Sequence, residues 1–276
     1  MGKTAILLTC YNKSDITLKC LSLLFSIVDD KFDVYLVDDG STDGTAERVS
    51  HFYPNVVIIQ GDGNLFWTRG MALAWRNAAK FDYDFYIWLN NDVYLFNNSF
   101  KELFSTSKLF QDKAIVSGIV VSQEGITLYG GYDAYKKLIQ PTGKANEITY
   151  LNGNFVLIPK YVYQCVGNFD TKYHHDLGDV DYGLTAKKLN IPVVTTRVAI
   201  ARGETNSICR ERMNNTTLLK RFEKLYSPLG SPPSINFHFR MKHKSVFNAV
   251  SYFVFQHLIN IMPDSVNKAV FGDKYT

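Results

Sequence analysis

The chain has 276 residues and a formal net charge of +4, and 46% of its residues are hydrophobic and 20% charged. This composition excludes an intrinsically disordered protein, and the length suffices for one large domain with or without a small appendage. The four cysteines lack metal-ligand spacing, which indicates reduced thiols in a cytosolic protein. We expect no signal peptide, because Met1–Lys3 lead directly into the first predicted strand. We expect no spanning helix, since no run reaches about 18 apolar residues.

Strand-like and helix-like segments alternate in the first part of the chain. Apolar runs predict four buried strands, at residues 5–9, 34–37, 56–59 and 85–89. Helical spacing appears between them, after a cap at Ser14 or Asp15 and again at residues 45–52 and 68–80. Buried strands that are separated by helices predict a mostly parallel sheet covered on both faces.

The pattern changes in the middle of the chain. Residues 115–121 and 155–158 have the composition of strands in a mixed sheet, and residues 179–189 that of a helix. A last short strand is expected at residues 193–195. Turn-forming residues between the two mixed-sheet strands predict loops, at Gly130, Gly131 and Pro141.

The C-terminal part differs in composition. We expect a first domain over residues 1–207 and a helical extension over residues 208–276, in which prolines mark a break and residues 246–262 form an amphipathic helix. Basic residues next to this apolar stripe favour a membrane surface or a dimer contact. Packing of the stripe against the first domain is an equal alternative, and we expect no nucleic acid partner.

Polar side chains follow three of the predicted strands at the point where each strand ends. Tyr11 and Asn12 follow the first strand, Asp38 and Asp39 the second, and Asp92 the fourth. The carboxyl ends of parallel strands form one edge of a sheet, where α/β proteins place ligands. Carboxylates there can hold a hard divalent cation against a phosphate, so the sequence predicts one site for one charged ligand.

Three of these runs together resemble a known family. Thr9–Asn12, Val37–Thr45 and Leu89–Asp92 occur in this order, as in the family 2 glycosyltransferases, which have the GT-A fold. The run Gly61–Trp67 and the Asn-Asn-Asp form of the metal motif resemble the rhamnosyltransferase-like branch. The resemblance extends from about Lys3 to Ser207. It implies a Rossmann-like, mostly parallel central sheet flanked by helices, with a C-terminal helical extension.

The resemblance implies a nucleotide-sugar site at the sheet edge. Asp39 would accept hydrogen bonds from the base or ribose, and Asp38 would support it. Further residues of the same site would be Thr9, Tyr11, Asn12, Asn64, Arg69, Asn90 and Asn91. Arg69 would pair with the diphosphate, with Asp38 or with Asp39. A plain turn with a helix cap is the alternative for the Asp38–Thr45 run.

Asp92 is the metal-ligand candidate, for Mg²⁺ or Mn²⁺. The family motif has two acids separated by one residue, and here Asn90 replaces the first. Many members also have a metal-binding His where this chain has Arg202. An Arg cannot ligate a cation but can pair with phosphate. We therefore expect Arg202 to share the charge neutralisation, and metal dependence to be weaker than usual.

Asp179 corresponds to the catalytic base of the family, which usually has Glu-Asp where this chain has Gly178 and Asp179. A carboxylate at a helix start can take the proton from an acceptor hydroxyl, although it can also merely cap the helix. The resemblance further implies contacts with the donor or acceptor sugar from Asn152, Gly153, Asn154, His174, His175 and Asp181. A tight turn is the alternative for the Asn-Gly-Asn run, and a structural role is the alternative for the two histidines.

These expectations describe an inverting hexosyl- or deoxyhexosyltransferase. Its donor would be a nucleoside diphosphate-sugar of UDP, dTDP or GDP, and its acceptor a glycan or a lipid-linked hydroxyl. The expected setting is bacterial surface polysaccharide synthesis, of capsule or O-antigen, in the cytoplasm at the inner face of the membrane. The sequence leaves open whether the chain forms a homodimer. Two alternatives are a sugar nucleotidyltransferase, which would want a glycine-rich loop after the first strand, and a non-catalytic sugar-nucleotide-binding protein.

Overall fold

The computed structural model describes residues 2–28, 32–205, 209–272 and 274–275. It divides into two compact units. The first unit comprises residues 1–174 and 178–205, and the second comprises residues 175–177 and 206–276. The expected boundary at residue 207 lies outside the described residues. The short segment 175–177 belongs to the second unit although the chain on both sides of it belongs to the first.

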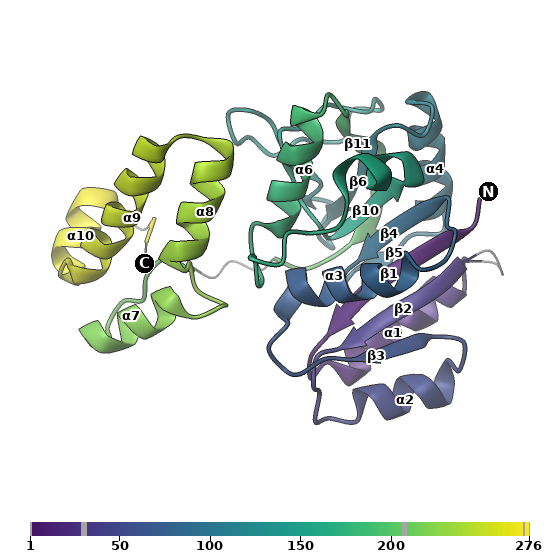
Figure 1. Cartoon of the computed structure of the whole chain (residues 1–276), viewed down its shortest axis with the longest axis horizontal. Coiled ribbons are helices and arrows are strands. Elements are labelled where there is room, and N and C mark those ends of the chain that lie inside the picture. Colours follow the sequence, from purple (N-terminus) through teal and green to yellow (C-terminus); the bar gives the residue numbers. More distant parts are fainter. Residues whose placement is uncertain (1, 29–31, 206–208, 273, 276) are drawn as a thin grey trace. The chain divides into compact units, whose positions relative to one another are not determined.

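The first unit is an α/β structure around a curved sheet (Figure 1). Its elements in chain order are β1 (Thr4–Cys10), α1 (Ser14–Phe25), β2 (Phe32–Asp38), α2 (Thr45–Phe52), β3 (Val57–Gln60), α3 (Phe66–Ala78), β4 (Phe85–Leu89), β5 (Tyr94–Leu95), α4 (Ser99–Leu109), β6 (Ile115–Val121), β7 (Thr127–Tyr129), β8 (Gly131–Tyr132), β9 (Tyr150–Leu151), β10 (Phe155–Pro159), α5 (Lys160–Val166), α6 (Gly178–Lys188) and β11 (Val193–Arg202).

The large sheet has the strand order β3-β2-β1-β4-β10-β6-β11-β5, and β7 pairs with β6. Strands β3, β2, β1 and β4 are parallel, whereas β10 is antiparallel to both of its neighbours. The expected mixed sheet is therefore present. Gly130, which was expected in a loop, separates the short strands β7 and β8 with a φ of 146°.

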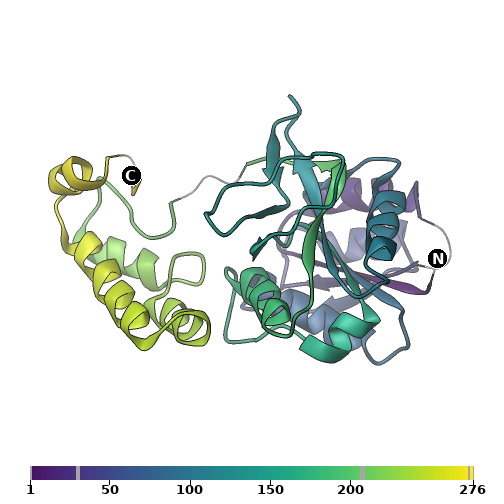
Figure 2. The ribbon, with the colours of Figure 1, turned by 90° about the horizontal axis from the view of Figure 1, so that it is seen from above.

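Helices cover both faces of the sheet (Figure 2). The side chains of β1 alternate between the two cores, because successive residues of a strand point to opposite faces. Ile6 and Leu8 join the core under α1, α2 and α4, whereas Ala5 and Leu7 join the core under α3, α5 and α6. Since both faces are buried, the strands are continuous apolar runs, as the sequence predicted.

Two local predictions were wrong. Neither Ser14 nor Asp15 caps α1 through its own side chain; instead the Asp43 carboxylate of the next loop accepts the N–H of Ser14 at 2.9 Å. The last strand was expected to end at residue 195, but β11 continues to Arg202. Its continuation pairs with β5 in the antiparallel direction, and this pairing brings the residues after β11 next to those before β5.

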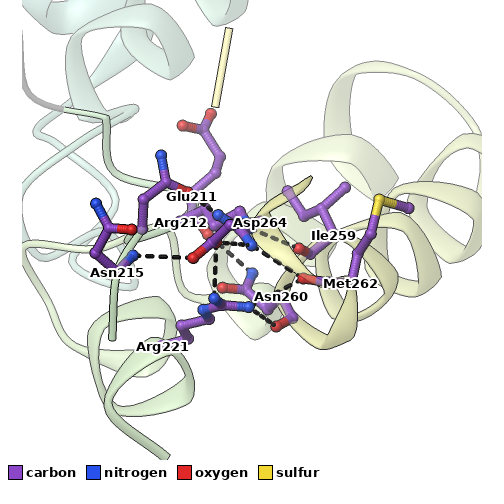
Figure 3. A network of polar contacts seen from close by, with 9 residues as sticks. Glu211, Arg212, Asn215, Arg221, Ile259, Asn260, Met262 and Asp264 are labelled. Carbon is purple, nitrogen blue, oxygen red and sulfur yellow. Dashed lines mark hydrogen bonds and ion pairs between the residues drawn. The ribbon is translucent and has the colours of Figure 1, made fainter. Parts of the chain in front are cut away.

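The second unit contains the helices α7 (Leu218–Tyr226), α8 (Pro233–His243), α9 (Val246–Ile261) and α10 (Asp264–Phe271). The hydroxyl groups of Thr217 and Ser245 cap α7 and α9. Inside this unit the guanidinium groups of Arg212 and Arg221 meet the carboxylate of Asp264 (Figure 3). Among the described residues, no helix is long and apolar enough to cross a membrane.

Candidate active site

The carboxyl ends of β1, β2 and β4 meet at one edge of the sheet. Cys10 pairs with Asp38 at the ends of β1 and β2, and β4 lies parallel to β1 on its other side. The chain order changes direction between β1 and β4, which is the position where ligands bind in open α/β sheets. The polar residues that follow these strands therefore gather at one place.

Asp39 organises the loop between β3 and α3. Its carboxylate accepts backbone N–H groups from Gly63 at 3.0 Å, Leu65 at 3.0 Å and Phe66 at 2.9 Å. The side chain is buried, with 4% of its surface exposed, and these bonds use three of about four acceptor positions. Asp39 thus fixes the backbone at the sheet edge, and its expected contact with the nucleoside stays a prediction.

The loops after β1 and β2 are joined by side chains. The N–H of Asn12 donates to the Ser41 hydroxyl at 2.9 Å, and the N–H of Thr42 donates to the Asn12 side-chain oxygen at 2.7 Å. Asp38 accepts the N–H of Ser41 at 3.1 Å. The hydroxyl of Thr45 holds the pKa of the Asp43 carboxyl group below its usual value. This loop pair forms one preorganised surface.

Thr9 and Tyr11 border this surface. A Cβ at Gly70 would lie 2.3 Å from the Thr9 hydroxyl, so the missing side chain of Gly70 lets α3 approach β1. Tyr11 is 56% exposed, and its ring is accessible to a base. Burial raises the pKa of the neighbouring Cys10 thiol to about 12, so this group stays protonated and offers no thiolate to a metal.

Asn64 lies in the loop between β3 and α3, and Arg69 lies in α3; the expected nucleotide contact of Asn64 stays a prediction. Asn64 is exposed, and its N–H donates to the Asp62 carboxylate at 2.9 Å. Arg69 donates from Nε to the carbonyl oxygen of Thr171 at 2.9 Å. The expected pairing of Arg69 with Asp38 or Asp39 is therefore wrong: both carboxylates bond to backbone N–H groups, and Arg69 bonds to the backbone of a distant loop.

Asn90 connects three segments of the site. Its side-chain oxygen accepts the indole N–H of Trp67 at 2.7 Å, and its amide nitrogen donates to the Asn154 oxygen at 2.6 Å. The Asn154 amide in turn donates to the Asn152 oxygen at 2.5 Å. Asn90 therefore holds the loop of residues 152–154 against Trp67, which explains an uncharged residue where the family motif has an acid.

Asn91 and Asp92, which follow β4, have different surroundings. The Asn91 amide donates to the Thr17 hydroxyl of α1 at 2.8 Å, so its role is to position the segment. Asp92 is solvent-exposed, yet loss of hydration raises the pKa of its carboxyl group, with a further contribution from the charge of Glu204 and an opposing one from Lys13. A nearby cation would therefore stabilise the ionised form of the Asp92 carboxylate.

Glu204 is a residue that the sequence did not single out. The antiparallel pairing of β11 with β5 sets Ala201 opposite Leu95 and Arg202 opposite Tyr94. When this register is continued past the strand ends, Glu204 lies opposite Asp92. The Tyr129 hydroxyl donates to the carbonyl oxygen of Glu204 at 2.9 Å and fixes its backbone. The charge of Glu204 contributes to the raised pKa of Asp92, so the two carboxylates lie near each other beside the sheet edge.

Arg202 lies two residues before Glu204, at the end of β11. It lines an open hollow of about 1010 Å³ together with Tyr94 and Glu124. The pKa of the Glu124 carboxyl group is lowered mainly by the Ser122 hydroxyl and also by the charge of Arg202. The structure thus gives Arg202 an acidic neighbour, and its expected contact with a diphosphate stays a prediction.

Asp179 stands at the start of α6 and contacts the same central loop. Its carboxylate accepts the N–H of Gly153 at 2.8 Å. A Cβ at Gly153 would lie 2.5 Å from the Trp67 ring and 3.1 Å from the Asp179 Cβ atom, so only glycine fits between them. The loop of residues 152–154 therefore touches both Asp179 and Asn90, and it joins the expected base to the expected metal segment.

Two neighbours of Asp179 have structural roles. A Cβ at Gly178 would lie 2.4 Å from the Thr68 side chain, so α6 packs on α3 too closely for the acid that the family usually has there. Asp181 is 3% exposed and accepts the Tyr173 hydroxyl at 2.9 Å. This bond fits a supporting role for Asp181, and its expected contact with a sugar stays a prediction.

His174 and His175 belong to different units. The carbonyl oxygen of His174 accepts the N–H of Thr68 at 2.9 Å, and burial lowers the pKa of its imidazole, with a contribution from Arg69. Burial lowers the pKa of His175 to about 4. Both rings are therefore neutral at pH 7, and their contact with a sugar stays a prediction.

The protein side chains at this edge can hold a divalent cation only together with phosphate oxygens of a bound nucleotide. In the described part of the chain, no group of three or more His, Cys, Asp or Glu side chains could hold a metal ion. Mg²⁺ and Mn²⁺ are commonly held by one or two carboxylates together with phosphate oxygens and waters. Asp92 and Glu204 offer that set of hard oxygen donors.

A family model described as "Glycosyl transferase family 2" matches residues 5–167. This is more than half of the chain, so the chain belongs to this family, and its fold is the predicted GT-A fold. The rhamnosyltransferase-like branch stays a prediction. No curated protein matches the chain at a significant level.

Solved structures share this fold at low sequence identity. The mannosyltransferase PcManGT from Pyrobaculum calidifontis, in complex with GDP-Man and Mn²⁺, has a TM-score of 0.57 and 15% identity over 100% of this chain and 76% of that one. TarS from S. aureus gives 0.60 and 13% over 98% and 45%, and residues 1–349 of TarS with UDP give 0.57 and 14% over 98% and 75%. The chain thus spans less than half of the longer TarS chain.

Proposed function

We propose that this family 2 glycosyltransferase moves a sugar from a nucleoside diphosphate-sugar to an acceptor hydroxyl, with inversion at the anomeric carbon. The observation that carries the proposal is the loop of residues 152–154. Gly153 bonds to Asp179, and Asn154 bonds to Asn90 at the start of the Asp92 segment. The base and the acidic pair therefore border the same loop.

In this mechanism Asp179 takes the proton of the acceptor hydroxyl while the acceptor oxygen forms its bond to the anomeric carbon. The bond from that carbon to the diphosphate breaks in the same displacement, and the sugar is inverted. Asp92 and Glu204 would hold a divalent cation, which when bound stabilises the negative charge of the leaving diphosphate. Asp39 keeps the loop at the nucleotide side in place.

Similar structures support a nucleotide-sugar as the ligand of this edge. PcManGT is in complex with GDP-Man and Mn²⁺, and TarS has been solved with UDP and with UDP-GlcNAc. The base, the sugar, the glycan or lipid-linked acceptor and the bacterial surface setting are part of the proposal. Family membership favours glycosyl transfer over the nucleotidyltransferase alternative.

The test is the release of nucleoside diphosphate from UDP-, dTDP- and GDP-sugars by the full chain with Mn²⁺ or Mg²⁺. We expect one base to be used, with release that is lost in Asp179→Asn. Binding of nucleotide without release from any donor, in the presence of glycan and lipid-linked acceptors, would favour the non-catalytic alternative and contradict the proposal.

A further inference from the structure

Helix α9 exposes large apolar side chains and carries no charged residue. Its 16 residues, Val246–Ile261, contain no Asp, Glu, Lys or Arg. A surface helix normally has charged or polar residues on the side away from the core, and a helix that is apolar all round is buried or lies in lipid. The apolar face of α9 that is exposed in this structure therefore requires a partner.

The inner face of α9 packs within the second unit through polar as well as apolar groups. Gln256 and Asn260 are fully buried. The Gln256 amide donates to the carbonyl oxygen of Ser231 at 2.7 Å, and the Asn260 amide donates to that of Glu211 at 2.9 Å. Turning the helix would break these bonds and leave buried polar groups unpaired.

The end of α9 is fixed by two arginines (Figure 3). Arg212 donates to the carbonyl oxygens of Ile259 at 2.8 Å and Met262 at 2.9 Å, and Arg221 donates to that of Met262 at 3.0 Å. Both guanidinium groups also pair with Asp264. Cations at a helix C-terminus satisfy its last carbonyl groups. The rotation of α9 is therefore set by the interior of the unit.

The outer face is a stripe of large apolar side chains, which we call the α9 stripe. Its members are Phe247 (82% exposed), Val250 (47%), Val254 (48%), Leu258 (56%) and Ile261 (58%). They follow one another at helical spacings of three and four residues, so they lie on one side of the helix. Val266 and Val270 of α10 are also exposed. An exposed apolar surface of this kind marks an interaction site.

The charge of the second unit indicates the partner. Residues 206–276 contain ten Lys and Arg residues and four Asp and Glu residues. Lys244 lies just before the Ser245 cap of α9, and Lys268 lies in α10; both are exposed. A second copy of the chain would bring the same positive charge to the contact, whereas an anionic lipid surface accepts both the apolar stripe and the lysines.

We propose that the α9 stripe docks on an anionic membrane surface, with α9 lying in the interface. The helix is about 24 Å long at 1.5 Å per residue, which is too short to cross a hydrocarbon core of about 30 Å. It therefore lies along the surface, with Phe247, Val254 and Leu258 among the acyl chains and the flanking lysines at the headgroups. This inference does not depend on the donor or on the reaction.

Vesicle flotation of the full chain tests the proposal. Vesicles of phosphatidylcholine alone are compared with vesicles that contain about 30 mol% phosphatidylglycerol, at low and high salt. We expect binding to the anionic vesicles, and weaker binding as salt rises. Leu258→Glu is expected to lower it about tenfold or more, because a charged group cannot enter the acyl region cheaply.

Two controls keep the test sharp. Leu109→Glu, at an apolar residue of the first unit that is 62% exposed, is expected to leave binding unchanged. The double variant Lys244→Glu with Lys268→Glu alters only exposed positions and should weaken binding at low salt by about fivefold or more for each lysine lost. Its unchanged far-UV circular dichroism would show that folding is intact.

Three results would overturn the proposal. The first is an absence of vesicle binding by the native chain. The second is equal binding to neutral and anionic vesicles. The third is a dimer in light scattering that Leu258→Glu dissociates while vesicles are not bound, which would make the stripe an interface between two copies.

Discussion

The two units of the chain distribute polar and apolar side chains in opposite ways. In the first unit the apolar residues fill two cores and the polar residues gather at one edge of the sheet, around Asp39 and Asn90. In the second unit Arg212 is fully buried in the interior, and Phe247 lies outside with 82% of its surface exposed. We propose that the first arrangement positions a small charged ligand, whereas the second presents an apolar surface.

This contrast shows that a buried polar group has a different effect in each place. At the sheet edge, Asn90 donates to Asn154 and Asp179 accepts the N–H of Gly153, so both side chains hold the loop of residues 152–154 beside the proposed site. In the helical unit, Arg212 and Arg221 hold the end of α9 so that its apolar stripe cannot turn inward. Each network fixes orientation rather than adding much net stability, as is common for buried polar groups.

The largest effect is expected from Asp179→Asn. The amide keeps an oxygen that can accept the Gly153 N–H but cannot take a proton from the acceptor. Loss of a general base costs about 10² to 10⁴-fold in rate. Turnover should fall by that amount in the nucleoside diphosphate release assay while nucleotide affinity stays the same. A variant with native turnover would remove Asp179 from the chemistry.

Arg212→Ala should destabilise the second unit and leave the stability of the first unit unchanged. Removing a buried charge that pairs with Asp264 and two carbonyl groups costs about 3 to 5 kcal/mol. All three Trp residues lie before residue 90, so their fluorescence reports the first unit, whereas circular dichroism reports both. We expect a urea transition by circular dichroism at lower urea and an unchanged fluorescence transition. Lys220→Ala, at an exposed site of α7, should change neither.

The same network predicts a dependence on pH. The Arg212 hydrogen bond lowers the pKa of the Asp264 carboxyl group below its ordinary value of 3.8. A lowered carboxyl pKa adds stability that is complete above the ordinary value and is lost as pH falls through the lowered one. Circular dichroism should therefore report loss of the second unit only below about pH 4. Loss of this unit between pH 5 and 7 would contradict that account.

Glu204→Gln should distinguish the acidic pair from the arginine beside it. If Glu204 shares a cation with Asp92, its amide variant should weaken Mn²⁺-dependent nucleotide binding by about tenfold. Arg202→Ala should change this binding less, because Arg202 lies beside Glu124. Titration calorimetry checks this order. A larger loss of binding in Arg202→Ala than in Glu204→Gln would show that Arg202, and not the acidic pair with its cation, neutralises the diphosphate.

Gly178→Ala should lower the stability of the first unit without removing a catalytic or binding group. The new Cβ would lie 2.4 Å from the Thr68 side chain, and overpacking of this kind costs about 1 to 3 kcal/mol. Adding Thr68→Ala removes the obstructing atoms and should recover most of the loss in urea unfolding. If the double variant is no more stable than Gly178→Ala alone, the close packing of α6 on α3 is not the reason for this glycine.

The sequence predicted the parallel sheet and the gathering of polar residues at its edge because both are properties of local patterns. Four apolar runs that end in polar residues define strand ends whatever packs around them, and the Asp38–Thr45 run was specific enough to indicate the family. The family match and the similar structures confirm that fold.

The errors came from partners that are distant in the sequence. The Asn90 side chain is hydrogen-bonded to Trp67 and Asn154, and Glu204 comes near Asp92 only because β11 continues to pair with β5. In the second unit the apolar stripe of α9 was predicted, but its spacing alone does not tell which face packs inward. The buried Gln256 and Asn260 decide that.

The most direct test of the active site is the binding of UDP, dTDP and GDP to the full chain, each with and without Mn²⁺, followed by thermal shift. We predict that one nucleoside diphosphate stabilises the native chain, more strongly with Mn²⁺, and that Asp92→Asn removes the effect of the metal while a smaller effect of the nucleotide remains. No stabilisation by any of the three nucleotides, or an equal effect of Mn²⁺ in the native chain and in Asp92→Asn, would contradict the assignment of this sheet edge as the donor site.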